Sequence, residues 1–241
     1  MQLLGLSMKK VRAIFISHEH TDHIRGMAGI ANKYSLPVYI TSHTLQHCHP
    51  LFRRELACTL RAYEAVAIGS ISVTAFPKHH DAIDPHSFIV CYNGITIGVF
   101  TDIGVPCDRV ISHFGQCHAA FLEANYDDDM LENGRYPSFL KNRIRGGKGH
   151  LSNRQALEIF TVHRPSFMSH LLLSHLSKDN NNPEMVEKLF NSQANGTQII
   201  VASRYQQTEV YTIQQSQELH TSPLISVMPL AQPKHMQLSL F

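Results

Sequence analysis

Short apolar runs alternate along the chain with segments in which apolar residues recur at helical spacing. Residues 11–17 form a largely β-branched apolar run, which predicts a buried strand. Within residues 22–34, apolar side chains share one helical face, which predicts a helix directly after that strand. Further strands are predicted over residues 37–40, 71–76, 88–92, 95–100, 119–124, 171–174, 197–202 and 209–213, and further helices over residues 53–66, 152–162 and 183–191.

Turn and cap residues mark the ends of several of these elements. Asn93-Gly94 separates two predicted strands and is a strong signal of a two-residue hairpin. Ser152 is suited to cap one helix, and Pro183 suits the first turn of another. Strands joined by hairpins and by helical crossovers indicate one layered α/β domain over residues 1–213. From about Gln214 the periodicity ends and polar residues dominate, so residues 214–241 are predicted to form a disordered tail.

Composition narrows the class of protein only in part. The 241 residues carry 21 Lys and Arg against 19 Asp and Glu, so nucleic-acid binding would require a local basic patch. We find no apolar run long enough to cross a bilayer and no signal-peptide pattern, which argues against a membrane partner. The 5 cysteines form no CxxC pair and predict reduced thiols in a cytoplasmic protein.

The segment His18-Glu19-His20-Thr21-Asp22-His23 concentrates metal-ligand side chains where the first strand gives way to a helix. Alternation along extended chain places His18 and His20 on one side. The turn that follows can direct Asp22 and His23 elsewhere, so the segment is able to serve two ions. Imidazole and carboxylate ligands suit Zn²⁺, Mn²⁺ or Fe²⁺.

Three more ligand-type residues follow later strands. His80 comes after residues 71–76, Asp102 after the hairpin, and His175 after residues 171–174. His79 is an alternative to His80, although His80 is favoured by the sequence His-Asp-Ala that it begins.

With these motifs the chain resembles the metallo-β-lactamase superfamily. The resemblance implies a four-layer αββα sandwich and two divalent metal ions, Zn or Mn. His18, His20 and His80 would bind one ion, Asp22, His23 and His175 the other, and Asp102 would bridge the two. Asp22 would also belong to the catalytic set.

Within that superfamily the chain is similar to the YycJ (WalJ, VicX) family of bacterial cytoplasmic nucleases. The matching motifs include His80-Asp81-Ala82, Thr101-Asp102-Ile103-Gly104, Gly149-His150-Leu151-Ser152-Asn153 and His175-Leu176-Ser177. Tyr126 departs from the family's ExNHD motif, where His is expected. The family also begins with a strand hairpin and a strand ending in Asp-Ala-Gly, none of which precedes Met1. We therefore expect an N-terminally short fold with intact metal ligands, an exposed sheet edge and a more open site.

The resemblance also assigns catalytic and substrate-binding residues. His150 would protonate the leaving 3′-oxygen of a phosphodiester, and Glu123 would orient His150 or the substrate. Asn125, Asp127 and Ser177 would contact the substrate, although Asp127 could equally serve a structural turn. Residues 141–154 contain five basic side chains and no acidic one, and the pair Gly146-Gly147 lets backbone amides approach a ligand. This segment predicts a phosphate track in which the binding residues are Arg143, Arg145 and Lys148.

Three functions compete at this stage. The leading one is a DNA phosphodiesterase, a 5′-exonuclease in DNA repair or replication maintenance. The others are a thioester or lactone hydrolase and a non-catalytic metal-binding interaction protein. The chain ends in Gln237-Leu238-Ser239-Leu240-Phe241, which resembles the peptide by which bacterial repair proteins dock on the sliding DNA clamp. Leu240 and Phe241 would be apolar anchors and Gln237 would fix the register by hydrogen bonds. Leu238 would belong to the same partner-binding set, and the clamp would be a partner beside DNA.

Overall fold

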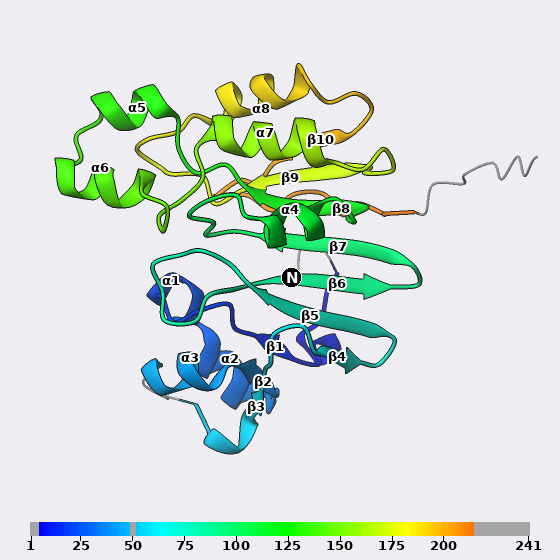
Figure 1. Ribbon diagram of the computed structural model, residues 1–241. Coiled ribbons are helices and arrows are strands. Elements are labelled where there is room, and N and C mark those ends of the chain that lie inside the picture. The colour runs from blue at the N-terminus through cyan, green and yellow to red at the C-terminus, as the bar shows by residue number, and fades with distance from the viewer. Residues whose placement is uncertain (1–4, 49–51, 215–241) are drawn as a thin grey trace, which may run out of the picture.

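The computed structural model describes residues 5–48 and 52–214, which form two β-sheets with helices on their outer sides (Figure 1). The small parallel sheet has the order β1-β2-β3 and contains β1 (Ile14–Phe15), β2 (Val38–Ile40) and β3 (Ala57–Thr59). The large sheet has the order β10-β9-β8-β7-β6-β5-β4 and contains β4 (Ala65–Ile68), β5 (Ile71–Pro77), β6 (His86–Tyr92), β7 (Ile95–Phe100), β8 (Ala119–Glu123), β9 (His170–Ser174) and β10 (Gln198–Val201).

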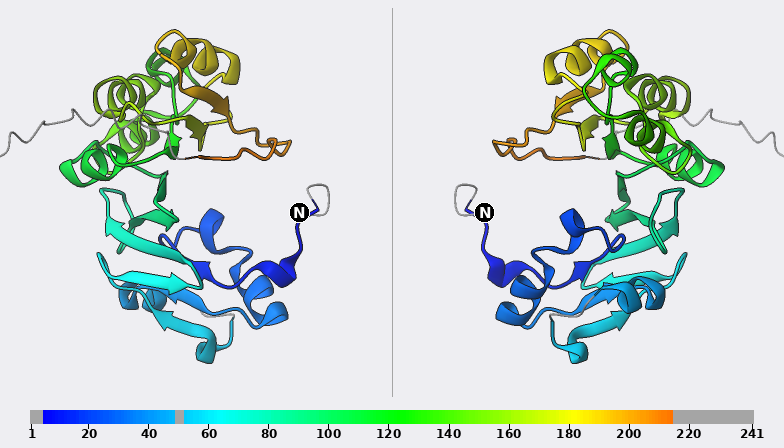
Figure 2. Two further views of the ribbon diagram at one scale, coloured as in Figure 1. Left: turned by 90° about the vertical axis from the view of Figure 1, so that its right-hand side faces the viewer. Right: turned by 90° about the vertical axis from the view of Figure 1, so that its left-hand side faces the viewer.

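The helices divide between the two sheets. Those near the small sheet are α1 (Thr21–Ile24), α2 (Met27–Tyr34) and α3 (Ser42–His47). Those beside the large sheet are α4 (Asp108–Phe114), α5 (Asp128–Asn133), α6 (Ser138–Arg145), α7 (Asn153–His163) and α8 (Pro183–Asn191). Figure 2 shows the two groups of helices at opposite ends of the molecule. Two short 3-10 helices, η2 (Met8–Lys10) and η3 (Arg54–Leu56), complete the described elements.

Three apolar clusters hold the layers together. One cluster, which includes Ile16 and Met27, joins the small sheet to its helices. A second cluster packs Phe88 of the large sheet against Phe15 and Tyr39 of the small sheet. The third and largest cluster lies between the large sheet and α4, α7 and α8. Because each cluster fills one interface between adjacent layers, the order is helix, sheet, sheet, helix, and the predicted αββα fold is confirmed.

Sheet topology collects the candidate ligands at one edge. Strands β7, β8, β9 and β10 are parallel, and β5 runs in the same direction because it is antiparallel to β6, which is antiparallel to β7. The carboxyl ends of β5, β7, β8 and β9 therefore meet at one edge of the sheet. The residues that end or follow these strands, His80, Asp102, Glu123 and His175, are brought together although they span nearly a hundred positions of the sequence.

Several predicted elements are correct. The hairpin lies at Asn93-Gly94, where both residues have positive φ (46° and 75°), as the mirror-image hairpin turn requires. Ser152 caps α7 in a capping box with Gln155, and α8 begins at Pro183.

Other predicted elements are wrong. Residues 53–66 do not form a helix, because this segment contributes a strand to each sheet. Strand β3 pairs with β2 in the small sheet, and β4, which begins at Ala65, pairs with β5 in the large sheet. Residues 209–213 are not a strand, since no neighbouring strand pairs with them in the described part of the chain. The helix over residues 22–34 is divided into α1 and α2 at Gly26. Helices α3, α4, α5 and α6 were not predicted.

The clamp-like peptide, with Gln237, Leu238, Leu240 and Phe241, lies outside the described residues.

All 5 cysteines are free thiols, as expected. Within residues 5–48 and 52–214, no helix has the length and apolar character needed to span a membrane.

Candidate metal centre and active site

The loop between β1 and α1 presents the first group of ligand-type side chains. Ile16 anchors the loop in the core, and the His18 that follows is fully buried. The hydroxyl of Ser17 lies 3.0 Å from Nδ1 of His18 and 3.3 Å from Nδ1 of His23. Ser17, which the sequence analysis did not select, therefore fixes the orientation of two imidazoles from one short loop.

His18, His20 and His80 form the first cluster, in which the ligand-type atoms lie within 4.8 Å of one another. Nδ1 of His80 contacts the carbonyl oxygen of Gly149 at 3.0 Å, which leaves Nε2 facing the cluster. His79 is exposed and does not enter the cluster. Of these two alternatives, His80 is therefore the one that joins His18 and His20.

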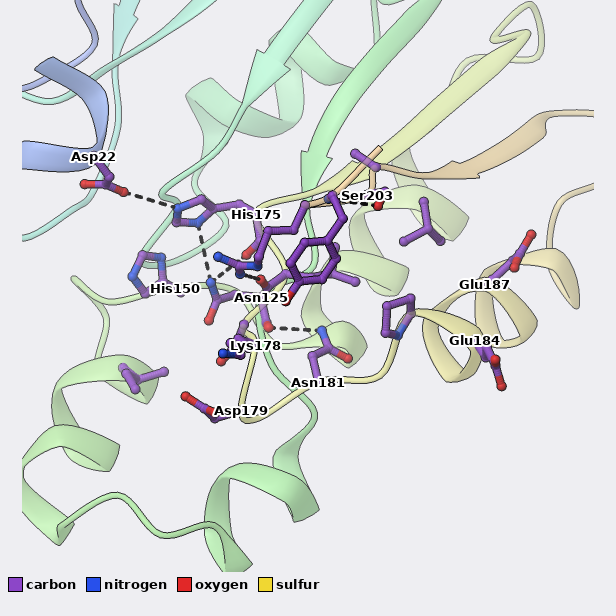
Figure 3. A pocket seen from close by; sticks show the side chains of 18 of the residues that line it. Asp22, Asn125, His150, His175, Lys178, Asp179, Asn181, Glu184, Glu187 and Ser203 are labelled. Atoms are coloured by element: carbon purple, nitrogen blue, oxygen red, sulfur yellow. Dashed lines mark hydrogen bonds and ion pairs between the residues drawn. The ribbon is translucent and has the colours of Figure 1, made fainter. Parts of the chain in front are cut away.

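Asp22, His23 and His175 form the second cluster, again within 4.8 Å. Nε2 of His175 lies 3.8 Å from Oδ2 of Asp22, a contact that joins α1 to the end of β9 (Figure 3). Nε2 of His23 lies 3.5 Å from the same carboxylate oxygen. These are the three residues that the family resemblance implies as ligands of one ion.

Asp102 lies between the two clusters. Its Oδ2 is 3.3 Å from Nε2 of His23, and its Oδ1 is 3.5 Å from Nε2 of His175 and 3.8 Å from Nε2 of His80. Asp102 and His175 both have positive φ, 56° and 57°, which is a costly backbone conformation for residues other than glycine. This strain at two facing residues is typical of a functional site.

The donor set fits divalent cations. Nε2 of His18 and Oδ2 of Asp102 are buried without a hydrogen-bond partner among the described residues, so each has a lone pair available for a ligand. Burial lowers the pKa of His18 to about 2 and that of His80 to about 4, which keeps both imidazoles neutral, as metal binding requires. Imidazole and carboxylate donors in this number suit Zn²⁺ or Mn²⁺.

Lys78 is a buried cation that the sequence analysis missed. Its side chain is 1% exposed, its Nζ donates to the carbonyl oxygen of Thr101 at 2.6 Å, and it lies 3.9 Å from Oδ2 of Asp102. Burial lowers the pKa of Lys78 to about 8. Burial would raise the pKa of Asp102, but the adjacent imidazole of His23 and the nearby charges of His175 and Lys78 hold it well below its usual range. Lys78 stands two residues before His80 in the sequence, and this proximity is the one sequence signal that could have identified it.

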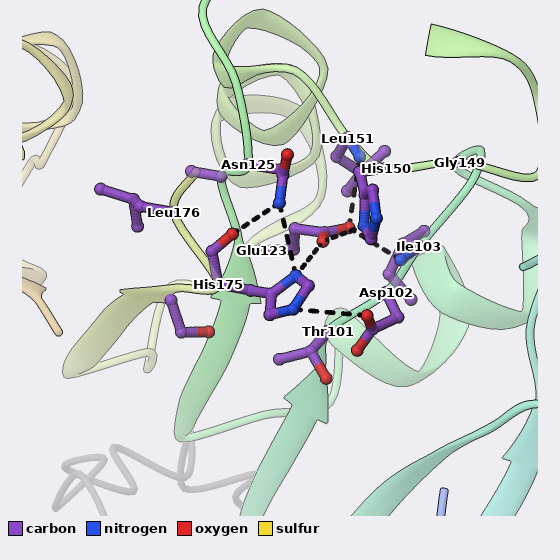
Figure 4. Close-up of polar contacts among 12 residues, drawn as sticks. Thr101, Asp102, Ile103, Glu123, Asn125, Gly149, His150, Leu151, His175 and Leu176 are labelled. Atoms are coloured by element: carbon purple, nitrogen blue, oxygen red, sulfur yellow. Dashed lines mark hydrogen bonds and ion pairs between the residues drawn. The ribbon is translucent and has the colours of Figure 1, made fainter. Parts of the chain in front are cut away.

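Glu123, at the end of β8, holds two histidines at once (Figure 4). Its Oε1 lies 2.8 Å from Nδ1 of His150 and 2.7 Å from Nδ1 of His175. Its Oε2 accepts hydrogen bonds from the backbone N–H groups of Ile103 and Leu151, at 2.8 and 3.2 Å. Full burial would raise the pKa of Glu123, but the hydrogen bonds from the two histidines lower it to about 2. Because the carboxylate only accepts, Nδ1 of each imidazole carries a proton, and Nε2 of each ring faces away from Glu123.

The predicted substrate-binding residues divide into two groups. Asn125 and Ser177 line a cavity that opens beside His150 and His175. The amide of Asn125 donates to the carbonyl oxygen of His175 at 2.7 Å. The carboxylate of Asp127 instead caps α5 by accepting from the N–H groups of residues 129 and 130, which matches the structural alternative.

The basic segment is more helical than expected. Residues 141–145 belong to α6, and only the residues after Arg145 form the turn that leads to His150. Arg143 pairs with Asp81, the neighbour of His80, and Arg145 pairs with Glu132 of α5 at 2.7 Å. Lys148 is exposed, and within the described ranges no ion pair involves it. The glycine of this turn at position 149 packs against the carbonyl oxygen of Ile144, so a side chain there would clash.

Comparison with known proteins gives consistent matches. A family model described as a β-lactamase superfamily domain matches residues 2–175. An exodeoxyribonuclease YycJ from Bacillus anthracis is 32% identical over 183 residues, which is 75% of this chain and 69% of the relative. An exodeoxyribonuclease WalJ from Streptococcus pneumoniae is 30% identical over 178 residues, or 72% of this chain and 66% of the relative. Among solved structures, the metallo-β-lactamase fold protein YhfI from Bacillus subtilis matches with a TM-score of 0.65 at 17% identity, covering 84% of this chain and 79% of YhfI.

Proposed function

The chain belongs to the metallo-β-lactamase superfamily and has a YycJ/WalJ-like relationship within it, and from this premise we propose that it is a metal-dependent phosphodiesterase that removes nucleotides from the 5′ end of DNA. Relatives of this fold support a metal-dependent hydrolase. The observation that carries the finer assignment is the pairing of His150 with Glu123 directly beside the two ligand clusters, because it supplies a proton donor for a leaving group.

The proposed ligands are those that the two clusters contain. His18, His20 and His80 would hold one ion and Asp22, His23 and His175 the other, and Asp102 lies against members of both sets. Two divalent ions in such a site act as Lewis acids on phosphate oxygens and lower the pKa of water toward neutrality.

The remaining steps belong to the protein's own side chains. A water molecule loses one proton to solvent and its oxygen forms a bond to the phosphorus as the bond from phosphorus to the 3′-oxygen breaks, so the leaving oxygen must gain a proton. We assign that proton to Nε2–H of the doubly protonated His150, whose Nδ1–H donates to Glu123 at 2.8 Å. The amide of Asn125, fixed by the carbonyl oxygen of His175, is placed to orient the substrate.

The basic turn would position the rest of the strand. Lys148 projects from the turn that leads to His150, and we propose that it contacts a phosphate of the incoming DNA. Arg143 and Arg145 would contribute after exchanging their carboxylate partners for phosphate, so we expect them to contribute less than Lys148.

The test is digestion of DNA labelled at either the 5′ or the 3′ end, with added Mn²⁺ or Zn²⁺ and with a chelator as the control. The proposal predicts early release of labelled mononucleotide from the 5′-labelled strand and a shortening ladder from the 3′-labelled strand. Release of the 3′ label first would contradict the proposed polarity. Turnover of thioesters or lactones without cleavage of DNA would replace the proposal with the small-molecule alternative.

We also propose a cellular setting. The five free thiols agree with a cytoplasmic protein, and the nuclease assignment agrees with a role in DNA repair or replication maintenance. The proposal that Gln237, Leu238, Leu240 and Phe241 dock on the sliding DNA clamp rests on the sequence of that peptide.

A further inference from the structure

A cavity of about 850 Å³ extends away from the candidate metal centre. One end is formed by Asp22, His150 and His175, and the other end reaches α8 through Glu184 and Glu187 (Figure 3). A volume of this size is ample for a nucleotide, since pockets for small ligands occupy roughly 300–1,000 Å³. The cavity is therefore an extension of the active site into which part of a substrate can pass.

The segment after β10 forms one wall of this cavity. The hydroxyl of Ser203 accepts hydrogen bonds from the backbone N–H groups of Tyr205 and Gln206, at 3.1 and 3.2 Å, which gives the segment a defined turn. The guanidinium of Arg204 donates to the carbonyl oxygen of Leu176 at 2.7 Å. Leu176 is the residue after His175, so Arg204 connects this wall directly to the loop that carries a candidate ligand.

Tyr205 is the most exposed of the large apolar or aromatic residues described in the chain, at 79%, although it lines the cavity. Exposure of a whole aromatic ring has no stabilising effect on the fold, because the ring stays in water. A ring at a cavity wall is instead suited to stacking against a flat partner, and bases stack on aromatic side chains in proteins that bind single strands.

The charges along the cavity change from one end to the other. Arg204 and Lys178 are basic lining residues, and Arg204 contacts the loop of His175 through Leu176. The acidic Asp179 also lines the cavity, next to Lys178 (Figure 3). Glu184 and Glu187, three positions apart on α8, line the far wall. Glu184 and Glu187 repel phosphate, so they disfavour the continuation of a DNA strand past α8. The cavity is therefore suited to the end of a strand.

We propose that this cavity binds the terminal nucleoside of a DNA strand, with its base stacked on Tyr205 and its phosphate beside Arg204 and Lys178. This pocket rests on the proposed function and would explain why the proposed nuclease acts at the ends of DNA strands. A strand that enters from the metal centre would end in this cavity, so the scissile phosphate would lie close to the strand end.

The experiment uses 2-aminopurine deoxynucleoside 5′-monophosphate, whose fluorescence is quenched when the base stacks. The chain contains no tryptophan, so protein emission does not interfere with the signal. Titration of the full chain should quench the probe. We expect Tyr205→Ala to weaken binding by about tenfold, within the range that base stacking contributes, and Tyr205→Phe to retain it.

Tyr92→Ala is the matched control, because Tyr92 is 49% exposed but lies at the opposite end of the large sheet, at the β6–β7 hairpin. This variant should bind the probe as the parent chain does. Arg204→Ala should weaken binding of the monophosphate and leave the corresponding nucleoside, which lacks phosphate, unaffected.

The outcomes separate this inference from the proposed function. DNA cleavage without quenching by the parent chain, or equal quenching by the parent and Tyr205→Ala, would overturn the nucleoside pocket and leave the nuclease standing. Quenching lost in Tyr205→Ala, in a chain that cleaves no DNA, would support the pocket and overturn the nuclease.

Discussion

Nδ1 of His150 lies 2.8 Å from Oε1 of Glu123, and the same oxygen lies 2.7 Å from Nδ1 of His175. One buried carboxylate oxygen therefore fixes the tautomers of two rings with different proposed roles. His150 is the proposed proton donor, and His175 is a proposed metal ligand, although both belong to one group of ligand-type atoms with Asp102 and Glu123. Substitutions at these positions should separate proton transfer from metal binding.

His150→Ala should lower turnover by roughly 10²–10⁴-fold, because a positioned general acid contributes an effect of that size. Metal content, measured by elemental analysis of the purified protein, should stay the same. His163→Ala, at the end of α7, is a control with an unrelated histidine. Loss of one ion in His150→Ala would show that this residue is a ligand.

Asp102→Ala should abolish activity and lower the metal content from close to two ions per chain. The Asp102 side chain contacts members of both clusters. Its loss should therefore lower metal affinity and activity by more than the roughly 10–100-fold decrease that follows loss of a residue that only supports a ligand. Circular dichroism should show a largely intact fold. Asp108→Asn, on the exposed first turn of α4, is the matched control. Normal turnover by Asp102→Ala would rule out the bridging role.

The chelator-treated protein should be most stable near pH 6.5. His18 and His80 have pKa values lowered to about 2 and about 4 in the folded protein. Below pH 6.5 the unfolded chain therefore binds more protons than the folded protein, and the free energy of unfolding decreases as the pH is lowered. Hydrogen bonds to Asp22 and Glu123 outweigh burial and raise the pKa of His175 to about 10. The stability that protonated His175 contributes is complete below pH 6.5 and is lost as the pH rises toward 10. Urea unfolding across pH 4 to 10 measures this dependence, and stability that rises steadily with pH would contradict it.

Lys148→Ala should weaken DNA binding and reduce the slope of log affinity against log salt by about 0.7–0.9, the effect of one lost phosphate contact. Arg143→Ala and Arg145→Ala should reduce it less, because these residues already pair with Asp81 and Glu132. Lys33→Ala, on α2, serves as the charge-matched control. Identical slopes for Lys148→Ala and the parent would indicate that the basic turn is only solvated.

A peptide of residues 230–241 should bind purified sliding clamp with an affinity on the order of micromolar. Replacing Leu240 and Phe241 by Ala should remove the binding, because these are the two apolar anchors. A peptide of scrambled order controls for composition. Absence of binding by the native peptide would remove the clamp as a partner and leave the hydrolase assignment unchanged.

The sequence by itself located side chains of ligand type at the ends of strands, because strand periodicity and short motifs involve only neighbouring residues. His18, His20, Asp22 and His23 follow one buried strand, and the hairpin at Asn93-Gly94 and the cap at Ser152 depend on neighbouring residues alone. Their assignments therefore needed no knowledge of the rest of the chain.

Tertiary structure decided what depends on pairing and burial. Residues 57–59 became a strand because β2 was available beside them, which overrode their local pattern. His80 was separated from His79 by burial at the sheet edge. Lys78 reached Asp102, and Glu123 reached His175, because parallel strands end together. The contact of Glu123 with His150, which the family resemblance had implied, is made from the loop that precedes α7. Contacts between residues far apart in sequence arise from this topology, and no local pattern contains them.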